Sequence, residues 1–311
     1  MASRPRLLHT EPIGSIKCRS KRRAAMALKI HPINFGNMSL DSSGLVLFRE
    51  PGKQVTIPVL GFLITGGTHP VLVDTGSRNV EQYAAFGLPY EVTPEMTIEH
   101  HLAQHGLKMG DIRHIVHTHA HIDHVGMTDR FPMTTTVGIS RRELEFAASG
   151  IMGPLMYTAA DTKHLIDRLH TRGAIRLFDV DGTFEEEVIP GVAVRLSGAH
   201  TPGSLSVLVE TDEGIANISG DIAYNLKDQL IDPILDQAAH EPTITANRAM
   251  STLDEKRAIK RALATSRFLL PSHDAPALVS GGKIVGVMEN AISNPQADVT
   301  KAANYTLLTA D

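Results

Sequence analysis

The 311-residue sequence has a single cysteine, no tryptophan and no long run of apolar residues. Because Cys18 is alone, a disulfide within the chain is excluded and thiolates are absent from any metal-binding set. No stretch is long and apolar enough to span a bilayer. Hydrophobic residues make up 42% of the chain and charged residues 21%, as in ordinary globular proteins. We therefore expect a cytoplasmic globular protein with a core large enough for one large domain, and the sequence gives no indication of its oligomeric state.

Positive charge is scarce outside the N-terminal segment. Residues 1–29 carry eight Lys or Arg and one acidic residue, Glu11, whereas the remainder carries 22 basic and 33 acidic residues. An acidic body repels the phosphates of nucleic acid, so we expect no nucleic-acid partner. Residues 1–29 lack the apolar region of a secretory signal. We interpret them as a disordered basic leader or as the product of an early start codon, with Met26 or Met38 as the true start. A transit peptide or anion-binding arm is the alternative, and residues 30–311 are predicted to form the folded domain.

The segment His119-Ala-His121-Ile-Asp123-His124 places four side chains that can bind metals within six residues. Imidazole nitrogen and carboxylate oxygen are common zinc ligands. In an extended segment His119, His121 and Asp123 would share one side, whereas His124 would point away. Four ligands on one ion are therefore not expected. The segment predicts a site for two ions that receives further ligands from elsewhere in the chain.

Three more candidate ligands lie later in the chain. His200, Asp221 and His273 each come three or four residues after an apolar run that predicts a strand. Ligands gather at the carboxyl ends of strands, although a lone polar residue is also common in any turn. With the first segment they make five His and two Asp. This set is enough for three ligands on each of two ions and one bridging carboxylate.

The chain has 16 histidines, so several must lie outside any site. His117, two residues before His119, is interpreted as a supporting or packing residue. The surface or core histidines without a role are predicted to be His100, His101, His105, His114, His164 and His170.

The whole pattern resembles the metallo-β-lactamase superfamily, whose hallmark is Thr-His-X-His-X-Asp-His-X-Gly followed by a separate His, Asp and His. Thr118 to Gly126 fits that segment at every fixed position, and Asp74-Thr75-Gly76 is similar to the family's Asp-Thr-Gly turn. The resemblance implies two sets of ligands: one metal held by His119, His121 and His200, the other by Asp123, His124 and His273, with Asp221 bridging. A set of nitrogen and oxygen ligands suits zinc, and also manganese, iron or cobalt.

Asp221-Ile-Ala-Tyr224 resembles the Asp-X-X-Tyr of the N-acyl-homoserine lactonases and their pyridoxolactonase relatives, in which the tyrosine hydroxyl faces the substrate carbonyl. Ser272-His273-Asp274 is similar to a segment of the same enzymes, whereas Ile122 replaces an aromatic residue often found there. The resemblance implies a quorum-quenching type of hydrolase that opens a small-molecule lactone with a hydroxide prepared by two divalent metal ions. Tyr224 is expected to polarise the carbonyl, and Asp123 to deliver a proton to the leaving oxygen.

Other functions are compatible with the same ligands. A thioester hydrolase of the glyoxalase II type resembles proteins with a basic C-terminal region, but residues 284–311 contain one lysine. A β-lactamase fits the ligand pattern less well, and a nuclease would need a positive surface. A metal-binding interaction protein on a decayed scaffold would be expected to have lost ligands, yet all seven are present. A lactonase is therefore the preferred hypothesis.

The order of expected elements favours an αββα sandwich, which the resemblance also implies. Further expectations concern local structure. Residues 55–65 and 70–74 should form a hairpin, and 97–105 a helix. Residues 111–118 should form a buried strand, with Asp123 capping the helix that follows. The expected elements of the second half are strands at 192–196, 204–210 and 215–219 and a helix at 251–264.

Residues 145–170 mix apolar side chains with glycine and proline, which does not predict a regular helix. One hypothesis is a loop that receives the apolar part of the substrate. The equal alternative is a connector that packs in the core. The apolar residues concerned are Phe146, Ile151, Met152, Leu155, Met156 and Tyr157.

Overall fold

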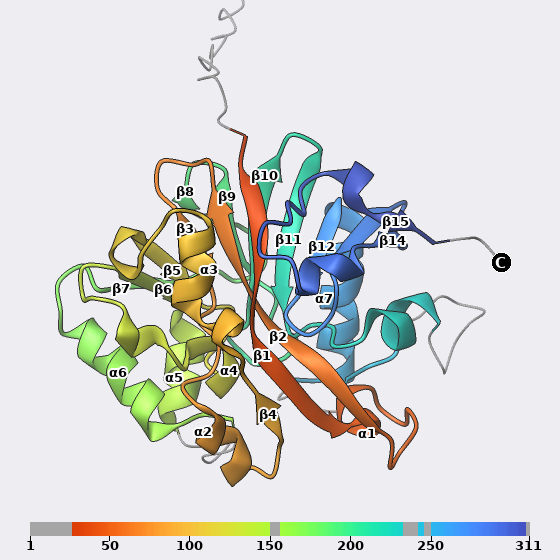
Figure 1. The fold of residues 1–311 in the computed structure, drawn as a ribbon, viewed down its shortest axis with the longest axis horizontal. Helices are drawn as coiled ribbons and strands as arrows, with labels where there is room; N and C mark the ends of the chain where they lie inside the picture. Colours follow the sequence, from red (N-terminus) through yellow and green to blue (C-terminus); the bar gives the residue numbers. More distant parts are fainter. Residues whose placement is uncertain (1–26, 150–155, 233–241, 246–249, 309–311) are drawn as a thin grey trace, which may run out of the picture.

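The computed structural model describes residues 27–149, 156–232, 242–245 and 250–308. They form two β-sheets packed face to face, with helices on the outer face of each sheet (Figure 1). This arrangement confirms the αββα sandwich. Within these residues no helix has the length and apolar character needed to cross a membrane.

The first sheet has the strand order β4-β1-β2-β3-β5-β6-β7. Its strands are β1 (Lys29–Asp41), β2 (Gln54–Thr65), β3 (Val71–Val73), β4 (Tyr90–Glu91), β5 (His114–Val116), β6 (Thr136–Ser140) and β7 (Ile175–Phe178). The helices that alternate with these strands along the chain are α1 (Ser42–Leu45), α2 (Val80–Ala85), α3 (Ile98–Gln104), α4 (Ile122–Val125), α5 (Arg141–Ser149) and α6 (Ala159–Leu169).

The second sheet has the order β15-β14-β13-β12-β11-β10-β9-β8. Its strands are β8 (Glu186–Ile189), β9 (Val192–Leu196), β10 (Leu205–Thr211), β11 (Gly214–Gly220), β12 (Phe268–Pro271), β13 (Ala277–Ser280), β14 (Lys283–Val287) and β15 (Thr306–Leu307). The long helix α7 (Thr252–Thr265) covers its outer face (Figure 1).

Alternating apolar residues build the layers. In β2, Phe62 belongs to the core between the sheets, whereas its neighbour Leu63 packs under the helices of the first sheet. In β12, Leu270 faces the first sheet and Leu269 faces α7. Because side chains alternate along a strand, a continuous apolar run such as residues 59–64 predicts a strand buried on both faces.

The strands that end near the site point the same way. In the first sheet β3, β5 and β6 run parallel to one another. In the second sheet β11 and β12 are parallel, and β9 shares their direction because each is antiparallel to β10. The loops after these strands therefore meet at one edge of the sandwich, where functional side chains gather in open α/β sheets.

Most of the local expectations are confirmed. β2 and β3 form the predicted hairpin through Gly66, and α3 begins at the capping residue Thr97. The Ser251 hydroxyl accepts from the Asp254 amide and caps α7, as the capping box predicted. The strand expected at 111–118 is shorter, because a 3-10 helix occupies Met109–Asp111 and the pairing of β5 ends at Val116.

The prediction of no regular helix within 145–170 was wrong for the described residues. α5 extends to Ser149 and α6 spans Ala159–Leu169. Tyr157 is buried, and Phe146 and Met156 pack against the core under the first sheet. The core-connector alternative therefore fits these three residues. Ile151, Met152 and Leu155 lie outside the described residues.

Candidate metal centre

The segment after β5 changes direction at His121. This bend places its four candidate ligands in two separate groups. His121 has extended backbone angles and precedes α4 as its N-cap residue, without a capping bond from its side chain. Asp123 is therefore not the cap that was predicted; it lies inside α4. The helical turn carries Asp123 and His124 away from His119 and His121, so the grouping expected for an extended segment is also corrected.

The first group of converging side chains contains His119, His121, His200 and Asp221, and all four are buried. His121 Nδ1 lies 3.0 Å from His119 Nε2 and 3.0 Å from His200 Nε2. Asp221 Oδ2 lies 3.7 Å from His119 Nε2 and 3.6 Å from His200 Nε2. Three imidazole nitrogens and one carboxylate oxygen thus surround one point.

The second group contains Asp123, His124, Asp221 and His273, which are also buried. His273 Nε2 lies 3.4 Å from Asp123 Oδ2 and 3.3 Å from Asp221 Oδ2. His124 Nε2 lies 3.3 Å from Asp221 Oδ1. Asp221 is therefore shared between the two groups, so the structure brings together all seven residues singled out in the sequence.

The donor atoms fit two divalent cations. Two ligands in a tetrahedral zinc site lie roughly 3.3 Å apart, given zinc–nitrogen distances of about 2.0 Å. Donor atoms within each group lie within 4.8 Å of one another. His124 Nε2, Asp123 Oδ1 and Asp221 Oδ1 are buried and have no hydrogen-bond partner among the described residues. Buried polar atoms are seldom left without a partner, so bound cations would account for these three.

The charges at the site also suit cations. Burial lowers the pKa of His119 and His121, which keeps these imidazoles neutral, as ligands must be. Burial also lowers the pKa of His273, but Asp221 and Asp123 more than offset this and raise it to about 10. The carboxylates therefore concentrate negative potential where the ring nitrogens of the second group converge.

Asp74 holds the metal-binding segment in place from the end of β3. Its carboxylate accepts from the Thr118 amide and the Thr118 hydroxyl, both at 2.8 Å, and contacts His124 Nδ1 at 2.8 Å. His117 Nδ1 lies 3.5 Å from the same carboxylate, and His117 Nε2 lies 2.9 Å from the Thr128 hydroxyl. Such contacts orient a ligand imidazole. His117 therefore has the supporting position that was expected of it.

Glu143 is a buried residue of the site that the sequence did not reveal. Its carboxylate accepts from the Ala120 amide and the Tyr157 hydroxyl, both at 2.9 Å, and from the Thr201 hydroxyl at 2.6 Å. Burial raises its pKa, and these donors partly offset the rise. Glu143 thus ties the His119–His121 turn to the His200 turn. Within the sequence it looks like a surface charge beside Arg141 and Arg142.

Tyr224 places a hydroxyl between the two groups. The hydroxyl donates to Asp221 Oδ2 at 2.8 Å and lies 3.4 Å from His200 Nε2. The ring stacks on His273, with centroids 5.0 Å apart and planes 6° apart. Burial and the nearby carboxylates raise the pKa of Tyr224 well above its usual value. The hydroxyl therefore stays protonated and remains a hydrogen-bond donor.

Comparisons with known proteins identify relatives of this chain. An N-acyl homoserine lactonase from Bacillus cereus is 27% identical over 216 residues, which are 65% of this chain and 80% of the relative. The N-acyl homoserine lactonase AttM from Azorhizobium caulinodans is 24% identical over 272 residues, 83% of this chain and 98% of the relative.

A solved N-acyl homoserine lactone hydrolase, with the product N-hexanoyl-L-homoserine bound at its catalytic metal centre, has the same fold. It superposes with a TM-score of 0.61 and 22% identity, and the match covers 80% of this chain and 94% of that one. The family model described as the metallo-beta-lactamase superfamily matches residues 56–259, more than half of the sequence. The chain therefore belongs to the metallo-β-lactamase superfamily.

Proposed function

We propose that this metallo-β-lactamase-fold hydrolase opens a lactone ring, of the N-acyl homoserine lactone type or a similar small lactone. The observation that carries the proposal is the Tyr224 hydroxyl, which lies beside both ligand groups at 2.8 Å from Asp221 and 3.4 Å from His200. The relatives named as N-acyl homoserine lactonases support the same reaction class.

Seven side chains would hold the two cations. His119, His121 and His200 form one set; Asp123, His124 and His273 form the other; and Asp221 would serve both. When bound, divalent cations of this kind polarise a carbonyl oxygen and lower the pKa of water toward about 7. Zinc is the proposed metal, because imidazole and carboxylate ligands in this number suit it.

Tyr224 would bind and orient the lactone carbonyl. Its hydroxyl is protonated, and its ring is held by the stack on His273, so the oxygen is positioned before substrate arrives and its one O–H would turn from Asp221 Oδ2 to the carbonyl oxygen. A fixed donor stabilises the oxyanion that forms when the carbonyl is attacked. The hydroxyl is an uncharged donor, which suits an ester oxygen better than a charged substrate group.

Asp123 would carry the proton to the leaving ring oxygen. Burial raises the pKa of its carboxyl group, but His124 and His273 outweigh this and lower the pKa to about 2. Asp123 therefore enters the reaction as an anion. It can accept a proton from the attacking water and release it to the alkoxide, which is a far stronger base.

A substrate panel tests the proposal. Turnover is followed with a pH indicator on acyl-homoserine lactones of several chain lengths, simple and aromatic lactones, and thioesters, with the metal content measured on the same preparation. We expect the highest kcat/KM on a lactone. A preparation with two metals per chain that hydrolyses thioesters but not lactones would replace the lactonase assignment with a thioesterase one.

A further inference from the structure

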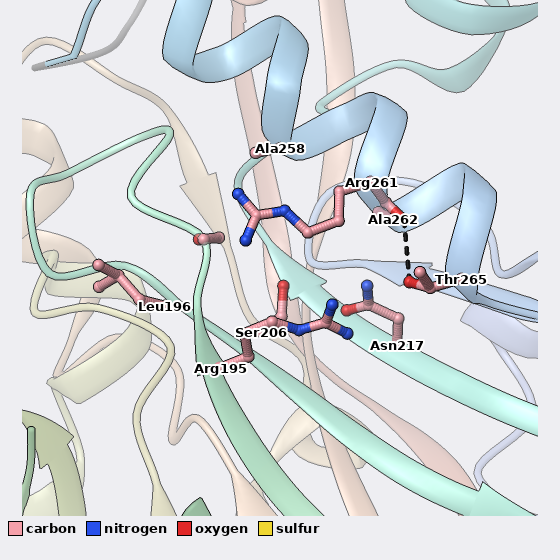
Figure 2. Close-up of a pocket in the computed structure, with 9 residues that line it drawn as sticks. Arg195, Leu196, Ser206, Asn217, Ala258, Arg261, Ala262 and Thr265 are labelled. Carbon is pink, nitrogen blue, oxygen red and sulfur yellow. Dashed lines mark hydrogen bonds between the residues drawn. The ribbon is translucent and has the colours of Figure 1, made fainter. Parts of the chain in front are cut away.

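A second polar pocket lies away from the metal centre, between α7 and the outer face of the second sheet (Figure 2). Arg195, Ser206 and Asn217 form its floor, and Ala258, Arg261 and Ala262 of α7 face them. The pocket lies behind the His200 turn, because its lining includes Leu196 and Ser197 at the end of β9.

The floor of this pocket is a polar stripe where an apolar surface is expected. Arg195 on β9 and Ser206 on β10 are register partners, and Asn217 lies on the next strand, β11. Elsewhere on this face α7 packs on apolar residues such as Leu269 and Val279. The alanines that α7 turns toward the stripe are small, so space remains above it. A sheet face under a helix is normally apolar, and a polar stripe there therefore needs partners.

The two arginines are not fully neutralised. Arg195 Nη2 lies 3.4 Å from Glu185 Oε1, whose side chain is 48% exposed. Arg261 Nη1 donates to the Gly182 carbonyl at 3.0 Å, and no carboxylate of the described residues pairs with it. Burial lowers the pKa of Arg195; Glu185 partly offsets this, and the nearby positive charge of Arg261 adds to the lowering. Two cations facing one partly exposed carboxylate favour an anion between them.

Polar groups on the floor add both donor and acceptor capacity. Asn217 is 2% exposed, and its Oδ1 has no hydrogen-bond partner among the described residues. The Ser206 hydroxyl can donate or accept. An anion that satisfies all these groups must accept hydrogen bonds from the guanidinium groups and also donate one to Asn217 Oδ1. A phosphate group that keeps a proton at neutral pH has both properties, whereas sulfate has no proton to donate.

We propose that this pocket binds inorganic phosphate, which still carries a proton at neutral pH. Arg195, Arg261 and Ser206 donate to its oxygens, and its protonated oxygen donates to Asn217. The whole pocket has room for about one water-sized group, so one phosphate oxygen enters it and the others lie outside it, beside the partly exposed Arg261. The site is independent of the reaction at the metal centre.

Calorimetric titration of the full-length protein with inorganic phosphate, at constant ionic strength, tests the site. We expect Arg261→Gln to weaken phosphate binding at least about tenfold, because a charge-assisted hydrogen bond is lost. Arg257→Gln is the matched control, since it removes the same charge from an exposed position on α7. It should leave the affinity unchanged, and thermal melts establish that both variants are folded.

Further titrations test where phosphate binds and whether other anions bind equally well. Phosphate bound at the metal centre alone would leave the Arg261→Gln affinity equal to that of the unchanged protein, and this would overturn the proposal. Sulfate binding as tightly as phosphate would also overturn it. Glycerol phosphate is largely without a proton at neutral pH, so it should bind more weakly than inorganic phosphate, and equally tight binding would also overturn the proposal.

Discussion

Tyr224 joins a fixed, stacked ring to a hydroxyl that faces both ligand groups. We expect Tyr224→Phe to keep both metals and to lower kcat for lactone hydrolysis about 100-fold, since removing one oxyanion donor typically costs about 3 kcal/mol. The measurement is steady-state turnover with metal analysis of the same sample.

Tyr305→Phe is the matched control for this change. Its buried hydroxyl donates to the Val299 carbonyl, away from the metal centre. The control should lose some stability and keep kcat. Full lactone turnover by Tyr224→Phe would remove the residue from the mechanism.

Glu143 supports the site from behind, because three donors from separate parts of the chain converge on its carboxylate. Glutamine has one acceptor oxygen and places an NH2 group against a donor. We expect Glu143→Gln to destabilise the fold by about 1–3 kcal/mol and to weaken metal binding by the His119, His121 and His200 set.

Thermal melts and a zinc titration against a chelator measure the two effects. Glu145→Gln serves as the control, since Glu145 is exposed on the same helix. Wild-type zinc affinity in Glu143→Gln would show that this carboxylate does not position the ligands.

At the scale of elements, the short helix α4 depends on the glycine that follows it. Gly126 has ordinary helical angles, but a Cβ there would lie 2.3 Å from the Arg78 amide nitrogen and 2.6 Å from the Ile122 carbonyl oxygen. Both are backbone atoms that cannot easily move. We expect Gly126→Ala to destabilise the protein by at least about 2 kcal/mol and to reduce its metal content.

Gly110→Ala provides the comparison, since nothing lies within 4 Å of the position its Cβ would take. Urea unfolding measures the free energy of unfolding of both variants. Equal stability of the two would mean that α4 tolerates a shift away from Arg78.

The ligand set could be predicted from the sequence because each member follows an apolar strand, and parallel strands bring their carboxyl ends to one edge. The position of Asp123 inside α4 could not be predicted from the sequence. The start of α4 at Ile122 depends on contacts with distant residues, such as the hydrogen bond from the Ile122 amide to the Met156 carbonyl. The role of Glu143 could not be predicted from the sequence for the same reason. Its partners at 120, 157 and 201 come together only in the folded chain.

The strand and helix predictions failed where local composition was the only guide. Phe146 and Tyr157 lie near glycine and proline, which argued against helix around them. Phe146 nevertheless lies in α5 and packs with Tyr157, their rings 5.7 Å apart, against the core of the first sheet. Burial of apolar surface in that core outweighed the local preference.

At the scale of the whole molecule, the metal centre joins the two sheets. His119 to His124 follow β5 of the first sheet, whereas His200, Asp221 and His273 follow strands of the second. Direct hydrogen bonds also cross here, such as that from the Leu60 amide to the Ser272 carbonyl at 2.8 Å. Cations that bind side chains of both sheets would therefore stabilise the sandwich as well as supply chemistry.

Removal of the metals tests this coupling. A ligand that binds only the folded state at about 100 times its Kd stabilises that state by about 2.7 kcal/mol. For a domain of this size we expect chelation to lower Tm by roughly 5 °C or more, and zinc to restore it. Differential scanning calorimetry with metal analysis measures the change. An unchanged Tm at zero metal content would mean that the packing between the sheets alone holds the seven ligand residues together.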